Sequence, residues 1–512
     1  MDGRRPTDAV APRPSTGSLP WLSQGPSLPW ALGIFAAVAA VWGAFLARNL
    51  AWDLRFEDAL IVLRYARNLV AGHGFVYNPG EQILGVTTPL YTLLSTVYIV
   101  LGGEHAPGVQ NLFGLLWMAL EAGLMLVLLH RLGHRWAGLA AALMILGNYN
   151  LTYLYLGMET HLFVALVLLA MVLNLDGERP WALGVALGLA FLVRYDAALV
   201  AALIGVDRWI RDRRLPWRMT LAFTAVVLPW LVFAQLYFGS ILPTSFGAKK
   251  DHFPALNYVL QVFEYYRTTY GRLLGFYLPG ARLPNLAAWG FPLVVLFGVA
   301  AAAWRDRRAL VPAAYPALHL AAYALIGSHP ASTWHVYLLN PFGYAFFAVG
   351  VAVALGFLCN AAARGIPALG RRRWLPVAVA VALMVPLLVH LQQQMRHRYR
   401  MDPLTSQLHA MSAWMVERYP AETSLLQPGI GVLGWETGFR IVDHAGLVTP
   451  GLYFHDDLHC TPVPEVLELH APDLVLLSQW SPAEIDHLGY RRVKTFVEPY
   501  EYRLYERKSR QP

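Results

Sequence analysis

Long apolar runs constrain the fold of this chain more than any other feature. A helix needs about 20 mainly apolar residues to cross the ~30 Å hydrocarbon core of a bilayer. Apolar residues occupy 56% of the 512 positions and charged residues only 14%, which excludes a soluble enzyme of several globular domains. The sequence therefore predicts a polytopic α-helical membrane protein. About eleven spans are expected, at residues 30–48, 108–130, 136–156, 160–175, 181–193, 197–210, 217–238, 286–304, 309–327, 336–360 and 374–391.

Arginine in the connecting turns predicts the orientation, because short cytoplasmic turns are rich in Arg and Lys. The stretch 89–101 is too short to cross comfortably and decides the topology. If it lies against the outer leaflet without crossing, the Arg-rich turns all fall on the side of the N-terminal arginines. These turns are at 131–135, 179, 208–218, 305–308 and 364–373. We therefore expect a cytoplasmic N-terminus and a non-spanning outer helix at 89–101.

Composition divides the chain into three regions. Residues 1–29 are rich in Pro, Ser and Gly and predict a disordered cytoplasmic tail. The transmembrane domain is expected at 30–392, and residues 393–512 lose the long apolar runs. Short strand patterns between Gly and Pro turns predict an extracytoplasmic α/β domain in this last region. Its expected elements are a helix at 403–418 and strands at 424–427, 440–443, 474–478, 493–497 and 500–505.

The outer loop 49–107 carries adjacent acidic residues, Glu57 and Asp58, at the start of an expected helix. One interpretation is a solvated pair that the helix dipole favours. The alternative is a general base, with or without a divalent metal, beside the membrane. Arg64 lies about two turns further on the same helical face, where a guanidinium suits an anionic phosphate.

The outer loop 239–285 contains Lys249 and Lys250, two of only four lysines in the chain. They are either a solvated basic turn or a clamp for a phosphate at the membrane surface.

Three more charged residues, Glu159, Arg194 and Asp196, lie at the expected outer ends of spans. Charges in such places are costly and often functional, although Arg194 and Asp196 can also form a satisfied pair at a helix–helix turn. Glu159 can likewise be an acid favoured by the start of the next helix. Acids and bases from four outer connections are thus expected on one membrane face.

Several sequence blocks resemble those of bacterial GT-C glycosyltransferases, in particular mycobacterial terminal arabinofuranosyltransferases. The first and most specific block runs from Glu57-Asp-Ala-Leu-Ile through Gly72-His-Gly-Phe-Val-Tyr-Asn-Pro-Gly-Glu81 to Gly85-Val-Thr-Thr-Pro. Later blocks follow in the expected order and extend the resemblance over most of the chain beyond the tail. They are Gly157-Met-Glu-Thr, Arg194-Tyr-Asp, Tyr237-Phe-Gly-Ser-Ile-Leu-Pro-Thr-Ser-Phe-Gly-Ala-Lys249 and Asp443-His-Ala-Gly-Leu.

The resemblance implies transfer of a sugar, with inversion, from a polyprenyl-phosphate carrier to an envelope glycan, lipid or protein. The reaction is expected at the outer face of the bacterial cytoplasmic membrane. The catalytic base maps to Glu57 or Asp58; the family more often has Asp-Asp, so Glu57 is a departure, although its place at the first acidic position favours it. Glu159 matches a second acidic residue of the family. Further substrate-binding candidates, with basic groups near the carrier phosphate, are Arg64, Tyr65, Arg194, Asp196, Lys249 and Lys250.

Two other classes of protein compete with this interpretation. A transporter or flippase of envelope precursors would place polar residues at mid-depth in several spans. A non-catalytic scaffold would only present residues 393–512. A nucleic-acid partner is not expected, because no basic stripe lies on a soluble domain. No cofactor is required by the sequence beyond the optional divalent metal.

Overall fold

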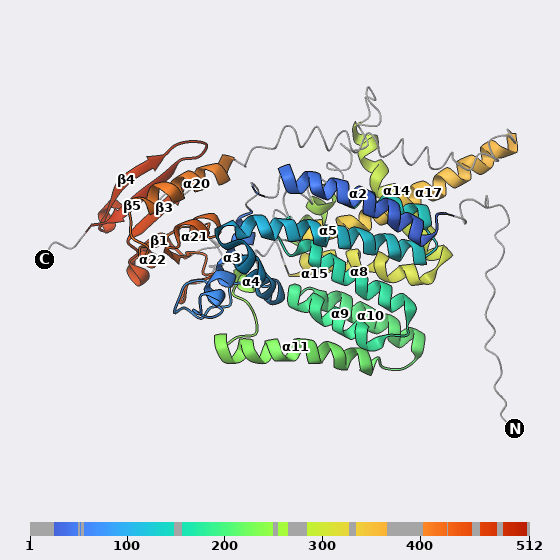
Figure 1. The fold of residues 1–512 in the computed structure, drawn as a ribbon, viewed down its shortest axis with the longest axis horizontal. Helices are drawn as coiled ribbons and strands as arrows, with labels where there is room; N and C mark the ends of the chain where they lie inside the picture. The colour runs from blue at the N-terminus through green and yellow to red at the C-terminus, as the bar shows by residue number, and fades with distance from the viewer. Residues whose placement is uncertain are drawn as a thin grey trace.

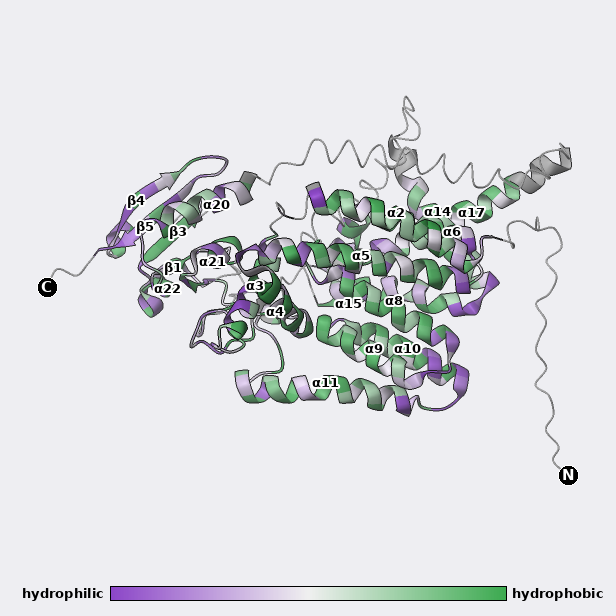
Figure 2. Cartoon of the chain, in the orientation of Figure 1, coloured by the Kyte–Doolittle hydropathy of each residue, from purple (hydrophilic) through white to green (hydrophobic). Residues whose placement is uncertain are grey.

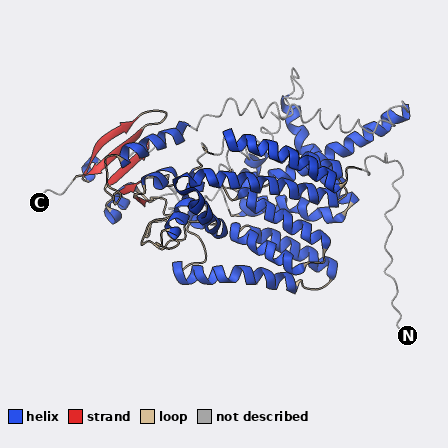
Figure 3. Cartoon of the chain, in the orientation of Figure 1, coloured by secondary structure: helices blue, strands red, loops and turns tan. Residues whose placement is uncertain are grey.

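The computed structural model describes residues 25–49, 52, 56–147, 156–248, 254–264, 284–326, 334–365, 403–427, 429–452, 461–478 and 485–508. A bundle of long helices is joined at one end to a small sheet domain (Figure 1, Figure 3). The bundle and its outer connections contain α2 (Leu28–Asn49), α3 (Glu57–Val70), α4 (Pro89–Gly102), α5 (Ala106–Arg131), α6 (Arg135–Leu146), α8 (Thr160–Asp176), α9 (Pro180–Val193), α10 (Ala197–Asp212), α11 (Trp217–Phe238), α12 (Ser245–Ala248), α14 (Pro284–Arg305), α15 (Leu310–Leu325), α16 (Trp334–Tyr337) and α17 (Asn340–Gly365).

The bundle helices are apolar along most of their length (Figure 2). In the described ranges, four helical stretches are long and apolar enough to cross a membrane: Leu28–Arg48, Pro89–Arg131, Trp217–Phe238 and Asn340–Leu358. Shorter apolar helices accompany them. The expected spans from 30–48 to 336–360 each overlap a described helix. The run 136–156 is described as helix only to Leu146, and the run 374–391 lies outside the described residues.

Helix α4 does not cross the bundle, as the arginine pattern predicts. A Cβ on Gly25, before α2, would lie 2.7 Å from the Cβ of Arg135, just after α5. A Cβ on Gly108, at the start of α5, would lie 2.2 Å from the ring of Trp52. The end of α2 and the start of α5 therefore lie at the same end of the bundle. Helix α4 has 14 residues, about 21 Å at 1.5 Å per residue, which is too short for two crossings.

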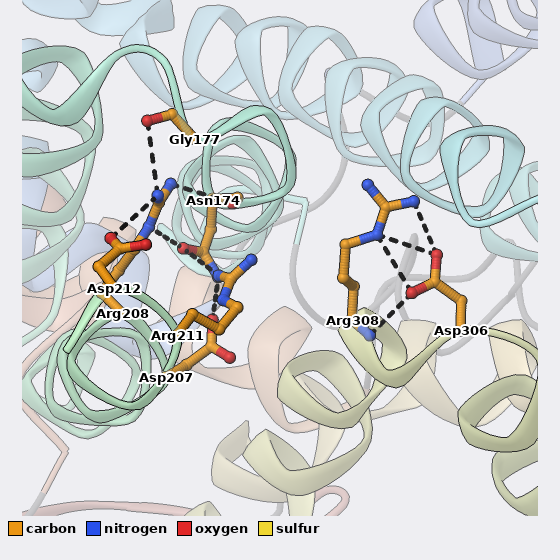
Figure 4. Close-up of polar contacts among 8 residues, drawn as sticks. All are labelled: Asn174, Gly177, Asp207, Arg208, Arg211, Asp212, Asp306 and Arg308. Carbon is orange, nitrogen blue, oxygen red and sulfur yellow. Dashed lines mark hydrogen bonds and ion pairs between the residues drawn. The ribbon is translucent and has the colours of Figure 1, made fainter. Parts of the chain in front are cut away.

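The arginine-rich turns meet at the opposite end of the bundle, which we call the basic end. Arg131 pairs with Asp176, and Arg305 lies against Gly133. Figure 4 shows Arg208 and Arg211 converging on Asn174, with distances of 2.7 and 3.0 Å to its Oδ1. The same view contains the pair Arg308–Asp306, whose shortest hydrogen bond is 2.7 Å. The turns that we expect on one side of the membrane are thus neighbours in space.

The C-terminal domain contains the expected α/β arrangement. Its five strands, in the order β2-β1-β3-β5-β4, are parallel between β1, β2 and β3 and antiparallel between β3, β5 and β4. All five residues of β3 are buried, as expected for a central strand covered on both faces. Of the expected tail, residues 1–24 lie outside the described residues, as does the expected domain boundary at 393. The strands are β1 (Ser424–Leu426), β2 (Arg440–Val442), β3 (Leu474–Ser478), β4 (Tyr490–Phe496) and β5 (Tyr502–Arg507), and the helices are α20 (Pro403–Val416), α21 (Val432–Thr437) and α22 (Val463–His470).

Candidate functional site

Helix α3 lies between the bundle and the C-terminal domain, and its first residue binds the start of α21. The Glu57 carboxylate accepts hydrogen bonds from the backbone N–H groups of Gly431, at 2.6 Å, and Val432, at 2.9 Å. These N–H groups have no partner within the helix, and the helix dipole favours a negative charge there. A Cβ on Gly431 would lie 1.9 Å from the Glu57 carbonyl oxygen, so the close approach requires glycine.

These contacts give Glu57, our preferred catalytic base, a structural partner. Both of its carboxylate oxygens hold α21, so the side chain has a structural partner. Burial raises the pKa of Glu57 to about 7, and the two N–H bonds offset only part of that rise. The choice of base between Glu57 and Asp58 stays a prediction, and the hydrogen bonds of Glu57 favour Asp58.

Replacing Glu57 by Gln is expected to change how stability depends on pH. The folded pKa lies above the ordinary value, so the folded protein holds the Glu57 proton more tightly than the unfolded chain does. Wild-type stability should consequently fall, relative to Glu57→Gln, as pH rises from about 4.5 to 7, by roughly 2–3 kcal/mol at most. Thermal unfolding of both purified proteins across this range measures the difference. Parallel curves would contradict the assigned burial of Glu57.

Arg64 also lies in the interface between the bundle and the C-terminal domain, which argues against its expected role in binding the phosphate. Its Nε donates to the Tyr77 carbonyl at 2.9 Å, and one terminal nitrogen donates to the Phe439 carbonyl at 2.6 Å and to Asn78 Oδ1 at 3.0 Å. The other terminal nitrogen donates to the Gly434 carbonyl. The side chain is 2% exposed. Its donors are directed at the protein backbone, so we no longer assign Arg64 to the carrier phosphate.

Tyr65 likewise has a structural role in place of the expected substrate contact. Its hydroxyl donates to the Ile83 carbonyl at 2.8 Å and accepts from the Gly85 N–H at 3.0 Å. The ring is completely buried. Its hydrogen bonds hold the loop that follows Glu81.

Other residues of the sequence blocks join the same interface. Asn78 exchanges hydrogen bonds with Ile441 of β2, at 2.8 and 3.1 Å. The Thr244 hydroxyl donates to the Leu447 carbonyl at 2.7 Å. Asp443 accepts N–H bonds from Ala445 and Leu447, and its burial raises its pKa to about 6. The first block and the block 237–249 therefore contribute contacts that attach the C-terminal domain.

Ala59, which follows Asp58 on α3, lies against the turn that precedes α8. A Cβ on Gly157 would be 3.4 Å from the Cβ of Ala59 and 2.8 Å from Asn111 Oδ1 on α5. Successive helical residues point about 100° apart, so Asp58 occupies the sector between Glu57, which faces α21, and Ala59, which faces Gly157. Its side chain is half-buried. The start of α3, which carries Asp58, thus contacts both the bundle and the C-terminal domain.

Glu159, Arg194 and Asp196 form one buried cluster two residues beyond Gly157. A terminal nitrogen of Arg194 donates to Glu159 Oε1 at 2.7 Å, and the other donates to Asp196 Oδ2 at 3.0 Å. The Tyr323 hydroxyl of α15 donates to the same oxygen at 3.0 Å. The satisfied-pair interpretation of Arg194 and Asp196 is therefore correct, and Glu159 extends it. The cluster joins the start of α8 to the break between α9 and α10.

The structure adds polar side chains that the sequence analysis missed. Tyr91 of α4 donates to the Gly157 carbonyl at 2.9 Å. Gln110 and Thr160 are each 1% exposed, and within the described residues Gln110 Nε2 and Thr160 Oγ1 have no hydrogen-bond partner. Single polar residues in apolar runs were the available signal, because they are expensive in a membrane.

The described residues give no support to a metal centre. They contain no group of three or more His, Cys, Asp or Glu side chains suited to hold an ion. The two acids of the buried cluster, Glu159 and Asp196, already form ion pairs with Arg194. Lys249 and Lys250 lie outside the described residues, so their expected place near the phosphate stays a prediction.

Comparison with known proteins gives the fold a name. Residues 390–508 match a family model described as a domain of unknown function (DUF8728). The chain is 28% identical over 285 residues to a terminal β-(1→2)-arabinofuranosyltransferase of Corynebacterium glutamicum. That match covers 48% of this chain and 39% of the relative, so the chain aligns with about two fifths of the relative's length.

Solved structures match over nearly the whole chain. ArnT from Cupriavidus metallidurans, bound to undecaprenyl phosphate, is 14% identical with a TM-score of 0.59, covering 95% of this chain and 100% of that one. The oligosaccharyltransferase AglB from Archaeoglobus fulgidus, in complex with an inhibitory peptide and a dolichol-phosphate, is 12% identical with a TM-score of 0.57, covering 94% and 75%. The chain is therefore a polytopic membrane protein with the GT-C fold and a C-terminal α/β domain, similar in part of its sequence to terminal arabinofuranosyltransferases.

Proposed function

We propose that this protein is a membrane glycosyltransferase. It moves a sugar from a polyprenyl-phosphate donor to an envelope glycan, lipid or protein at the outer face of the bacterial cytoplasmic membrane. The observation that carries the proposal is the position of the start of α3: Glu57 binds α21, Ala59 lies against Gly157, and between them Asp58 is a half-buried carboxylate. The polyprenyl phosphates named with ArnT and AglB, and the activity named for the arabinofuranosyltransferase, support the reaction class.

In this mechanism Asp58 removes the proton from the acceptor hydroxyl. The hydroxyl oxygen then forms a bond to the anomeric carbon while the bond from that carbon to the phosphate oxygen breaks, which inverts the configuration. Polyprenyl phosphate leaves with the bonding electrons and needs nearby positive charge. Lys249 and Lys250 are our proposal for that charge. Gln110 and Thr160 are our candidates to bind sugar hydroxyls, because Nε2 of Gln110 and Oγ1 of Thr160 have no partner among the described residues. The Arg194 cluster holds the turn that carries Glu159.

A transporter of envelope precursors is the alternative, and one observation favours it. Glu121 of α5 and His161 of α8 form a buried pair at 2.7 Å inside the bundle. Such a path would need similar polar groups at mid-depth in several helices. The other charged clusters described above gather at the two ends of the bundle, which fits an enzyme at the membrane surface better.

The proposed orientation places the basic end in the cytoplasm and the C-terminal domain outside. Reporter fusions after residue 214, in the basic end, and after residue 508 should therefore report opposite compartments, because arginine-rich turns are retained inside. A fusion after residue 178, in another turn of the basic end, is the control and should match the fusion at 214. The same compartment for 214 and 508 would contradict the outer site.

Comparison of envelopes from cells with and without this protein tests the proposed function directly. Linkage analysis of the glycan and lipid fractions should show the loss of one sugar linkage and accumulation of the unmodified acceptor. Expression of the wild-type chain should restore that linkage. Unchanged linkages with altered export of an intact precursor would favour the transporter.

A further inference from the structure

An apolar groove lies at the basic end of the bundle, far from the candidate site. Helix α9 forms its floor, and α10 and α11 form its walls, since both pack on α9 (Figure 1). Its volume is about 420 Å³, within the range of ~300–1,000 Å³ that is typical of small-molecule sites. The lining includes Leu187, Val206, Trp209, Pro216, Met219 and Phe223.

Exposed arginines lie next in sequence to the lining residues Leu215, Pro216 and Met219. The turn from α10 to α11 carries Arg213 and Arg214, and Arg218 follows in the first turn of α11 with its guanidinium 5.2 Å from the ring of Trp217. Figure 2 shows this turn as hydrophilic beside apolar helices. Among the described residues, no carboxylate forms an ion pair with these three arginines, whereas Arg208 and Arg211 bind Asn174 and nearby acids (Figure 4).

We propose that the groove is a binding site for an anionic phospholipid. One acyl chain occupies the apolar space between α10 and α11, and the phosphate lies against Arg214 and Arg218. Basic pockets between membrane helices bind anionic head groups, and guanidinium groups suit phosphate oxygens. The indole rings of Trp209 and Trp217, both more than half exposed, are typical of the level where acyl chains meet head groups. A zwitterionic lipid lacks the net charge that the arginines select.

Native mass spectrometry of the purified full-length protein, with phosphatidylglycerol or phosphatidylcholine of the same acyl chains, tests this site. The wild-type protein should retain phosphatidylglycerol preferentially. Arg214→Gln with Arg218→Gln should weaken that binding by about 25-fold, at roughly fivefold for each arginine near an anionic lipid, and leave phosphatidylcholine binding unchanged. The charge-matched control is Arg48→Gln with Arg307→Gln, two exposed arginines of other helices and turns, which should bind like the wild type.

A second variant tests the groove itself. A Cβ on Gly205 would meet only Met219 Cε, at 3.7 Å, so Gly205→Leu fits the fold while filling the space. It should reduce retention of phosphatidylglycerol although every arginine is present. Equal retention of the two lipids by the wild type would overturn the proposal, as would unchanged phosphatidylglycerol binding in either variant. Thermal unfolding of each variant confirms that the folded chain is being compared.

Discussion

Replacing Asp58 by Asn is expected to lower the rate of sugar transfer by ~10²–10⁴-fold, the usual contribution of a general base. Binding of the polyprenyl-phosphate donor should be nearly unchanged, because the base acts on the acceptor hydroxyl. Turnover and donor binding are measured on the same purified protein. Asp58 is half-buried at the start of α3, so we expect its replacement by Asn to leave the protein folded. Thermal unfolding of the variant and the wild type checks this.

The neighbouring variant Glu57→Gln is the matched control for this prediction. It removes an adjacent carboxylate of the same helix, but one that binds the N–H groups of Gly431 and Val432. Its main effect should be on the attachment of the C-terminal domain and thus on stability. A larger loss of turnover in folded Glu57→Gln than in Asp58→Asn would reverse the assignment.

Among the substitutions proposed here, Arg194→Met should cause the largest loss of stability. The variant leaves the buried carboxylates of Glu159 and Asp196 without their cation, which typically costs about 3–5 kcal/mol. Arg418→Met is the comparison, since its pair with Glu417 is solvent-exposed and worth less than ~1 kcal/mol. Thermal unfolding of the two variants measures the difference.

Neutralising the carboxylates tests the cause of this loss. If the penalty comes from unpaired charge, adding Glu159→Gln and Asp196→Asn to Arg194→Met should recover part of the stability. No recovery, or a loss no greater than that of Arg418→Met, would show that the cluster does not hold α8 against the break between α9 and α10.

Much of the fold could be predicted from the sequence because bilayer thickness and arginine distribution leave few arrangements. The runs between 30 and 360 coincide with helices, and α4 stays at one end of the bundle, as the turns at 131–135 and 305–308 require. The five strands also lie where alternating apolar residues predict them. These features depend on patterns local to each segment.

The roles of individual site residues were harder to predict because they depend on contacts across more than 350 residues. Arg64 faces β2 and α21 instead of a phosphate, since Gly434 and Phe439 bring backbone carbonyls to it. Glu57 caps a helix that begins at Val432. A sequence shows that a charge lies at the start of a helix, but not which distant backbone group reaches it first.

Transfer of a labelled sugar from a polyprenyl-phosphate donor by the purified chain is the most direct test of the central claim. The reaction contains an envelope fraction from cells that lack this protein as the acceptor, and free polyprenyl phosphate is quantified together with the labelled product. The proposed function predicts that both appear in equal amounts with the wild type and fall by ~10²–10⁴-fold with Asp58→Asn. Equal amounts of product with the wild type and with folded Asp58→Asn, or no release of polyprenyl phosphate by the wild type, would contradict it.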